Sequence, residues 1–264
     1  MNMTRVRVRR ERPTALALAV ALCVTMLIVY VLTLDAKGPD VVESMAAAPR
    51  VTREIGFEPL SGWCVSMAGC ESQQEARLQA SAWVGRGAAG CVRELEGEWR
   101  VLGALYDSRK EAERISRRLR DDEGIPAEAI HLEAKGLTLR VTAPEAQIEA
   151  VAGADALLRS QTAQMGDIAL QLDRGEISAD AARALCALAA TEASNMAASL
   201  AAIPGAKENE LCAGLIGRME ELAGMQDTVA GGTRADAASL SGMLRCAQIE
   251  NFLGQWEMMR GLYG

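Results

Sequence analysis

The chain has 264 residues, of which 28 are basic and 35 acidic, giving a formal net charge of −7 at pH 7. Without its arginine-rich first 13 residues, 23 basic and 34 acidic residues remain, a formal charge of −11. Nucleic acids and anionic lipid surfaces both select a basic face. The charge balance therefore argues against nucleic acid, and against docking on anionic lipid headgroups, for the main part of the chain.

The first 34 residues predict a membrane anchor. Five arginines within residues 1–13 precede an uncharged stretch, of which residues 14–34 supply 21 positions. About 20 apolar residues cross the hydrocarbon core of a bilayer, and basic flanks stay on the cytoplasmic side. A cleavable signal peptide ending near Ala46–Ala48 is the alternative, but its apolar region would span only about 7–15 residues. We expect a cytoplasmic basic tail at 1–13 and a signal anchor at 14–34 in the lipid bilayer of the cell membrane, with the C-terminal domains extracytoplasmic.

Residues 35–58 predict a linker between the anchor and the first folded domain. The segment contains Gly38-Pro39, an alanine run and Pro49, together with mixed charges and no sustained hydrophobic period. Such a composition is typical of a flexible spacer. We expect this linker to hold the next domain away from the membrane.

A repeat with a spacing of 36 residues organises the next segment, 59–143. Aligned from Trp63 and from Trp99, the two copies are identical at six of fourteen positions. Each copy predicts a short strand, a tight turn and a helix that opens with Ser-x-x-Glu, a capping box at Ser72 and again at Ser108. Two strand–helix halves in tandem predict a split βαβ (ferredoxin-like) sandwich, in which both helices cover one face of an antiparallel sheet and the other face is open.

Alternating apolar residues, turn dipeptides and helix caps place the elements of this segment. Strands are expected at 63–67, 89–95, 99–105 and 130–133, and helices at 73–85 and 109–122. The Lys135-Gly136 turn leads into residues 137–141, which we expect to add a fifth strand to the same sheet.

From residue 144 to residue 264 the sequence predicts helices only. Thr142-Ala143-Pro144-Glu145 is a capping box with proline at an early helical position, which marks a helix start. Breaks follow at Gly175, at Pro204-Gly205 and at Gly231-Gly232. Four amphipathic helices joined by short loops predict an antiparallel four-helix bundle. The expected fold is therefore α+β: a transmembrane helix, a split βαβ domain and an all-α C-terminal domain.

The sequence offers no constellation of catalytic or metal-ligating residues. Its single histidine, His131, falls in an expected strand, and no zinc-protease motif, nucleophile elbow or phosphate-binding loop is present. Seven cysteines occur, one of them within the expected span. The other six permit disulfides in an exported domain, yet their spacing follows no metal or redox pattern, and buried free thiols are the alternative. We expect no enzyme activity, no cofactor and no metal.

Particular residues in the two copies of the repeat carry a family resemblance. The first copy contributes Trp63-Cys64-Val65-Ser66-Met67-Ala68 and Ser72-x-x-Glu75-Ala76. The second contributes Trp99-Arg100-Val101-Leu102, Tyr106 and Ser108-x-x-Glu111-Ala112. With these residues, the segment 62–141 resembles the SPOR (sporulation-related repeat) domain, a family with a βαββαβ core. Its members typically belong to single-pass membrane proteins and bind septal peptidoglycan, especially glycan strands stripped of stem peptides.

The resemblance implies glycan binding at the open face of the sheet. Strand alternation places Val65 and Val101 in the core and turns their neighbours toward that face. The candidate glycan-binding residues are Cys64, Ser66, Arg100 and Leu102, together with Tyr106. The chain departs from the family here, because Ser66 stands where glutamine is common and Cys70 where an aromatic residue is common. Side chains that favour sugars are therefore scarce at this face.

Two functions remain open from the sequence. In the first, the SPOR-like domain binds peptidoglycan glycan strands or localises the protein to a division or sporulation septum. In the second, the protein is a membrane-tethered interaction factor that binds an envelope or septal protein through the C-terminal helical bundle, with the SPOR-like domain as a scaffold. The composition of the open face favours the second function, and the family resemblance favours the first.

Overall fold

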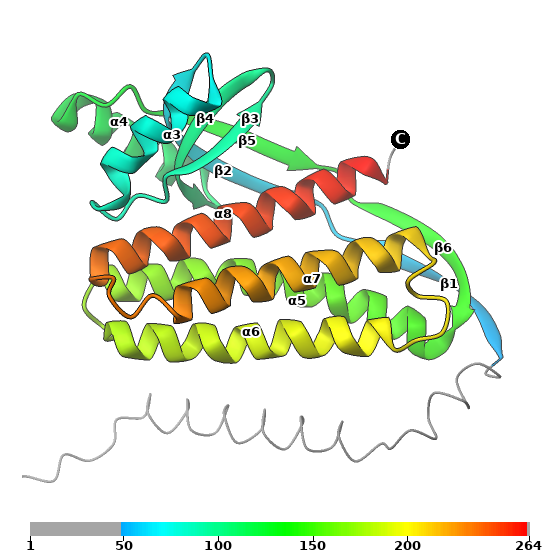
Figure 1. Ribbon diagram of the computed structural model, residues 1–264. Coiled ribbons are helices and arrows are strands. Elements are labelled where there is room, and N and C mark those ends of the chain that lie inside the picture. The colour runs from blue at the N-terminus through cyan, green and yellow to red at the C-terminus, as the bar shows by residue number, and fades with distance from the viewer. Residues whose placement is uncertain (1–48, 263–264) are drawn as a thin grey trace, which may run out of the picture. The chain divides into compact units, whose positions relative to one another are not determined.

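The structure of the protein, a computed structural model, describes residues 49–262 (Figure 1). The expected cytoplasmic tail at 1–13, the anchor at 14–34 and the first part of the linker lie outside the described residues. Among residues 49–262, no helix is both long and apolar enough to cross a bilayer. This part of the chain is α+β, with antiparallel sheets and two helices followed by four C-terminal helices that pack together, as the sequence predicts.

A four-stranded antiparallel sheet forms the centre of the N-terminal half, with the strand order β3-β4-β2-β5. Its elements follow the chain as β2 (Leu60–Cys70), α3 (Gln73–Val84), β3 (Cys91–Leu95), β4 (Glu98–Tyr106), α4 (Arg109–Glu123) and β5 (Glu128–Ala134). Helices α3 and α4 pack on one face, over buried clusters that contain Val101 and Val65 respectively. The Ser72 hydroxyl accepts from the Glu75 amide at 3.2 Å and caps α3 as predicted. The Ser108 side chain makes no such bond, although α4 begins after it.

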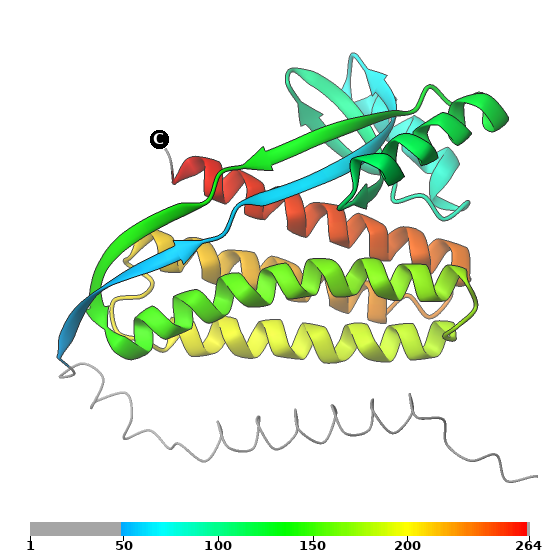
Figure 2. The same ribbon diagram turned by 180° about the vertical axis from the view of Figure 1, so that it is seen from behind.

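Strands β1 (Arg50–Phe57) and β6 (Leu137–Pro144) form a separate antiparallel ribbon, which packs against the first C-terminal helix (Figure 2). Residues 50–57 of the predicted linker are therefore a strand. The predicted fifth strand of the main sheet pairs with β1 instead. Ile55 and Phe57 are buried within the ribbon. Arg53 interrupts the alternation of apolar residues from Val51 to Phe57, so the strand is a weak signal in the sequence.

The predicted capping box at Thr142 is wrong. Thr142 lies in β6, where its Oγ1 is 2.8 Å from Oγ1 of Thr52 in β1. The first C-terminal helix begins after Pro144, which makes no side-chain cap. The Thr142 hydroxyl, which the predicted cap would have needed, therefore interacts with Thr52 across the ribbon instead.

The four C-terminal helices are α5 (Glu145–Asp173), α6 (Ala179–Ala201), α7 (Glu210–Ala230) and α8 (Ala237–Gly261). The loops between consecutive helices contain the glycine and proline residues from which the helix ends are predicted. The first turns of α6, α7 and α8 are capped by side-chain oxygens of Ser178, Asn209 and Asp236, each accepting from the amide three residues on. These caps satisfy backbone donors that a helix start otherwise leaves without a partner.

Helix α8 lies between the four-stranded sheet and the other three C-terminal helices (Figure 1). It packs against α5 and α7 on one side and against β3, β4 and β5 on the other. Thirteen of its 25 residues are buried, because a helix with partners on two sides buries more than one stripe. The segments predicted as two domains, 59–143 and 144–264, therefore share a core, and the described chain forms one compact unit.

Candidate functional site

The sheet face opposite α3 and α4 is covered by α8. A Cβ atom built on Gly62 of β2 would lie 2.8 Å from the Phe252 ring of α8 and 2.9 Å from Leu105 of β4. Toward the edge of the sheet, the Cys91 thiol of β3 donates to the Glu250 carboxylate of α8 at 2.9 Å. The expectation of an open sheet face is therefore wrong, because the C-terminal helices supply a partner for it.

Four of the five candidate glycan-binding residues lie on this covered face. Cys64, Ser66 and Leu102 have exposed fractions of 0%, 1% and 0%. Arg100 keeps 21% of its side chain exposed, and its guanidinium pairs with one carboxylate from β4 and one from β5. A sugar chain therefore cannot reach the three buried side chains while α8 is in place.

Tyr106 lies on the opposite face, among the residues that pack beneath α4. Val65 pairs with residue 104 and Ser66 with Leu102, so Gly103 is an extra residue in β4. Such a β-bulge reverses the alternation of the strand beyond it. Leu102 and Tyr106 therefore face opposite sides of the sheet, although they are four positions apart and regular alternation would place them on the same side. Burial raises the pKa of the Tyr106 phenol.

Replacing Gly62 by alanine is expected to destabilise the contact between α8 and the sheet. The added methyl group would overlap the Phe252 ring and Leu105, and overpacking a core costs about 1–3 kcal/mol. Gly56→Ala in β1 is the matched control, because no atom lies within 4 Å of its Cβ position. Urea unfolding followed by circular dichroism should show a lower free energy of unfolding for Gly62→Ala only. Equal stability of the two variants would contradict this packing.

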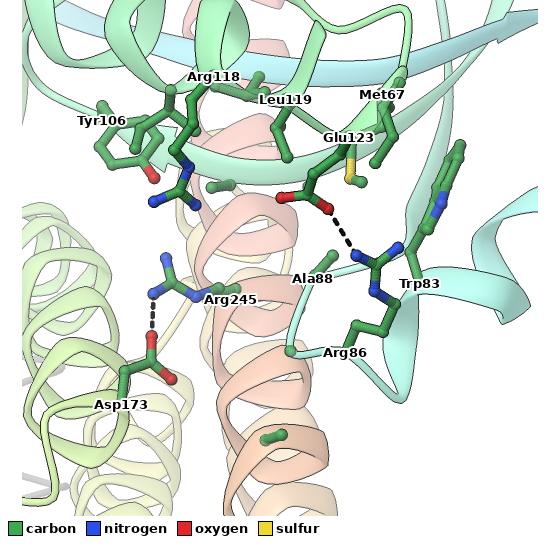
Figure 3. Close-up of a pocket in the computed structure, with 17 residues that line it drawn as sticks. Met67, Trp83, Arg86, Ala88, Tyr106, Arg118, Leu119, Glu123, Asp173 and Arg245 are labelled. Atoms are coloured by element: carbon green, nitrogen blue, oxygen red, sulfur yellow. Dashed lines mark hydrogen bonds and ion pairs between the residues drawn. The ribbon is translucent and has the colours of Figure 1, made fainter. Parts of the chain in front are cut away.

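A cleft opens between α4 and the C-terminal helices (Figure 3). It has two adjoining parts, with volumes of about 310 and 770 Å³. We call it the α4 cleft, and both of its parts are lined by Tyr106, Ile115, Arg118, Asp173 and Arg245. The smaller part is also lined by the apolar side chains of Met67, Ala88 and Leu119. Unlike the covered sheet face, this cleft presents an exposed residue, Arg118, to solvent.

The smaller part of the α4 cleft contains more cations than carboxylates. Arg245 pairs with Asp173 at 2.5 Å, and Arg86 pairs with Glu123 at 2.6 Å. Arg118 forms no ion pair with any residue of the described chain, and its side chain is directed toward Arg245 (Figure 3). Of these two guanidinium groups only that of Arg245 has a carboxylate partner, Asp173, which lies on the side of Arg245 away from Arg118 (Figure 3). The arrangement favours an anionic ligand group.

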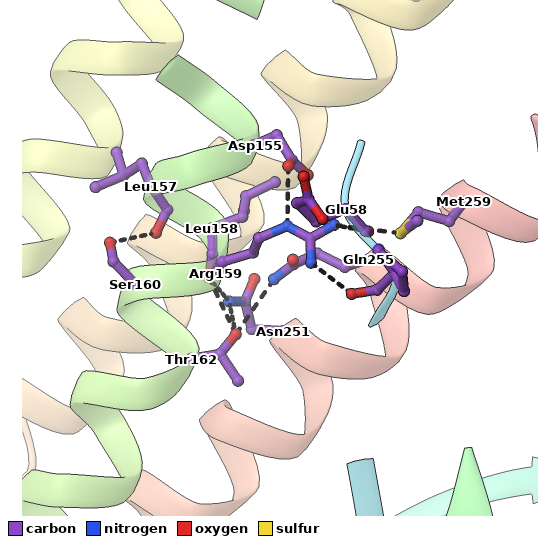
Figure 4. A network of polar contacts seen from close by, with 11 residues as sticks. Glu58, Asp155, Leu157, Leu158, Arg159, Ser160, Thr162, Asn251, Gln255 and Met259 are labelled. Atoms are coloured by element: carbon purple, nitrogen blue, oxygen red, sulfur yellow. Dashed lines mark hydrogen bonds and ion pairs between the residues drawn. The ribbon is translucent and has the colours of Figure 1, made fainter. Parts of the chain in front are cut away.

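A polar network beside the cleft joins the β1–β2 junction to α5 and α8 (Figure 4). Arg159 of α5 donates to Asp155 at 2.9 Å and to the two carbonyl oxygens of Glu58-Pro59 at 2.7 and 3.2 Å. The buried amide of Asn251 in α8 donates to the Thr162 hydroxyl of α5 at 2.7 Å. The network therefore fixes three of the segments that border the larger part of the cleft.

The six cysteines of the described residues are free thiols, five of them buried. The structure thus corresponds to the buried-thiol alternative. Burial raises the pKa of Cys64 to about 12 and that of Cys186 to about 11. Because the thiolate is the reactive form, both side chains are inert at neutral pH and act as small core residues.

No family model, curated protein or solved structure matches the chain. Its function is therefore inferred from the arrangement of its own residues. Two features bear on that function: the sheet face that α8 covers, and the arginine-lined α4 cleft that remains accessible.

Proposed function

We propose that the protein is a single-pass, membrane-tethered interaction factor of the cell envelope, in which a SPOR-like unit serves as a scaffold. The observation that carries the proposal is the coverage of the sheet face by α8, which withholds the expected glycan-binding side chains. The strand order β3-β4-β2-β5, with two helices on one face, is that of a ferredoxin-like split βαβ unit and supports a SPOR-type scaffold. The anchor at 14–34 and an extracytoplasmic C-terminal region are part of the proposal.

The occupant that best suits the α4 cleft is a segment of a partner protein with acidic side chains. Arg118 and Arg245 offer planar guanidinium groups, which bind carboxylates in a bidentate manner. The apolar side chains of Met67 and Leu119 can cover the aliphatic parts of the same segment. Because α5 and α8 form one wall, the partner would contact the C-terminal helices as well as α4.

Glycan binding through the sheet is the competing proposal, and it requires α8 to leave the sheet. The test is a pull-down of the full chain in detergent, with intact peptidoglycan sacculi and with sacculi freed of stem peptides by an amidase. A known glycan-binding SPOR protein serves as the positive control. We expect neither preparation to retain the chain. Retention that rises after amidase treatment would overturn the proposal, because it would show recognition of bare glycan strands.

Charge reversal at Arg118 is expected to weaken partner binding at least tenfold, or about 1.4 kcal/mol. The substitution Arg118→Glu places a carboxylate where the acidic segment would bind. Arg117→Glu is the matched control, since Arg117 is the adjacent exposed residue of α4 and does not line the cleft. Isothermal titration calorimetry with a glutamate-rich peptide measures the affinity. Equal losses for the two variants would indicate a general effect of net charge and contradict the cleft as the site.

A photo-crosslinking residue in living cells tests the same site with the natural partner. Placed at position 114, which lines the larger part of the cleft and leaves Arg118 and Arg245 intact, it should form an adduct with a protein, whereas at position 117 it should not. An adduct of equal yield at both positions would contradict binding in the cleft. The protein captured at position 114 should carry an acidic segment, and loss of the adduct when Arg245→Glu is introduced into the same chain would confirm the contact.

A further inference from the structure

Two thiols and one carboxylate converge where β3 meets α8. Cys91 is the first residue of β3, and Cys246 and Glu250 are one helical turn apart on α8. Their ligand atoms, two Sγ and one carboxylate oxygen, all lie within 4.8 Å of one another. Cys91 is buried, and the other two residues are partly exposed. The three side chains thus form a compact donor set that opens toward solvent on one side.

The carboxylate of this set is held in place from outside it. Arg93, two residues after Cys91 in β3, forms an ion pair with the second oxygen of Glu250. Arg218 of α7 donates to the backbone carbonyl of Glu250 at 3.2 Å. The first oxygen of Glu250 accepts from the Cys91 thiol at 2.9 Å. Carboxylates that bind a metal are commonly oriented by such an outer hydrogen bond.

We propose that Cys91, Cys246 and Glu250 form a binding site for Zn²⁺. Two thiolates and a carboxylate suit this borderline-soft ion, whereas Mg²⁺ and Ca²⁺ select oxygen ligands alone. A tetrahedral ion with bonds of about 2.0–2.3 Å separates its donor atoms by roughly 3.3–3.8 Å. Donors that already lie within 4.8 Å of one another need only small side-chain movements. Binding releases the two thiol protons to solvent, and a water molecule takes the fourth position.

A disulfide between Cys91 and Cys246 is the alternative use of the two thiols. An extracytoplasmic location permits such a bond, but a disulfide uses no third donor, whereas here Glu250 is part of the cluster and Arg93 holds it. A bound ion would join β3 to α8 and so fasten α8 over the sheet face. This inference is independent of the partner proposed for the α4 cleft, so either can fail without the other.

Cobalt is the probe, because Co²⁺ occupies zinc sites and its thiolate complexes absorb in the near-ultraviolet and visible ranges. The full chain is purified with a reductant and a chelator and then freed of both before titration. We expect one Co²⁺ per chain, a thiolate-to-cobalt absorption band, and loss of that band when one equivalent of Zn²⁺ is added. Cys91→Ala and Cys246→Ala should abolish the band, and Arg93→Ala should lower the affinity about 10–100-fold.

Cys186→Ala and Cys212→Ala are the matched controls, since both remove buried thiols of other helices and should leave the band unchanged. Thermal unfolding without metal checks that each variant folds, and Cys246→Ser replaces Cys246→Ala if the latter does not. A band that survives loss of Cys91 or Cys246 would overturn the proposal. A reduced chain that binds no Co²⁺ would also overturn the proposal. The disulfide would then be the use of the two thiols if air oxidation removes two thiols from the unchanged chain and removes none from Cys91→Ala or Cys246→Ala.

Discussion

Phe252→Asp is expected to lower the free energy of unfolding by at least about 5 kcal/mol. The Phe252 side chain is 3% exposed and contacts the sheet at Gly62. Removal of a buried phenylalanine ring costs about 3–5 kcal/mol, and a buried carboxylate without a partner adds its desolvation cost. Because whole domains are stable by only about 5–15 kcal/mol, this substitution should remove most of the stability of both halves together.

Urea denaturation of the full chain, followed by far-ultraviolet circular dichroism, measures this loss. Leu78→Asp is the matched control: Leu78 on α3 is 68% exposed, and changes at such positions usually stay within about 0.5 kcal/mol. A single transition at lower urea concentration is expected for Phe252→Asp. If only the C-terminal helices became less stable while the sheet unfolded as before, the sheet would not depend on α8, and the shared core would be disproved.

Local signals were enough to predict most of the secondary structure. The expected strand at 99–105 differs from β4 by one residue at each end, and the expected helix at 109–122 differs from α4 by one residue. Glycine and proline breaks likewise located the four C-terminal helices. These signals depend on hydrogen bonds and side-chain preferences within a few residues of the chain. Tertiary context was not needed for them.

The position of α8 depends on contacts that local signals do not encode. Its apolar stripe predicts one buried face, as in a helical bundle. The residues that meet the N-terminal half include Gly242, Cys246 and Phe252, and a Cβ on Gly242 would lie 2.7 Å from the Ala88 carbonyl oxygen. A glycine that permits close approach and a cysteine do not form a recognisable second stripe. The covered sheet face was therefore unpredictable from the periodicity of α8.

The candidate sites differ in how far the sequence could specify them. Alternation correctly placed Cys64 and Leu102 on the same sheet face, but the bulge at Gly103 moved Tyr106 to the other side.

Nothing in the sequence indicated the α4 cleft, because Arg118 and Arg245 lie on helices far apart in the chain. Charged residues of this kind are normally read as solvated helix faces. Only the packing of α4 beside α8 brings the two guanidinium groups together.

Arg159→Met is expected to lower the free energy of unfolding by about 2–3 kcal/mol. Arg159 donates to Asp155 and to the two carbonyl oxygens of Glu58-Pro59, and the side chains of Arg159 and Asp155 are only 22% and 12% exposed. Methionine keeps the aliphatic packing but removes these three hydrogen bonds and the weaker one that Arg159 donates to the Met259 sulfur. It also leaves the Asp155 carboxylate without its partner in a largely buried place, which costs more than the loss of an exposed pair.

Arg174→Met is the matched control for this prediction, because Arg174 pairs with Glu176 at 3.8 Å and both side chains are more than half exposed. It should change the stability by at most about 0.5 kcal/mol. The double variant Arg159→Met, Asp155→Ala should recover part of the loss, since it removes the unpaired carboxylate. Urea unfolding measures all three variants. If Arg159→Met were as stable as Arg174→Met, the β1–β2 junction would be held by apolar packing alone, and the network in Figure 4 would contribute nothing to it.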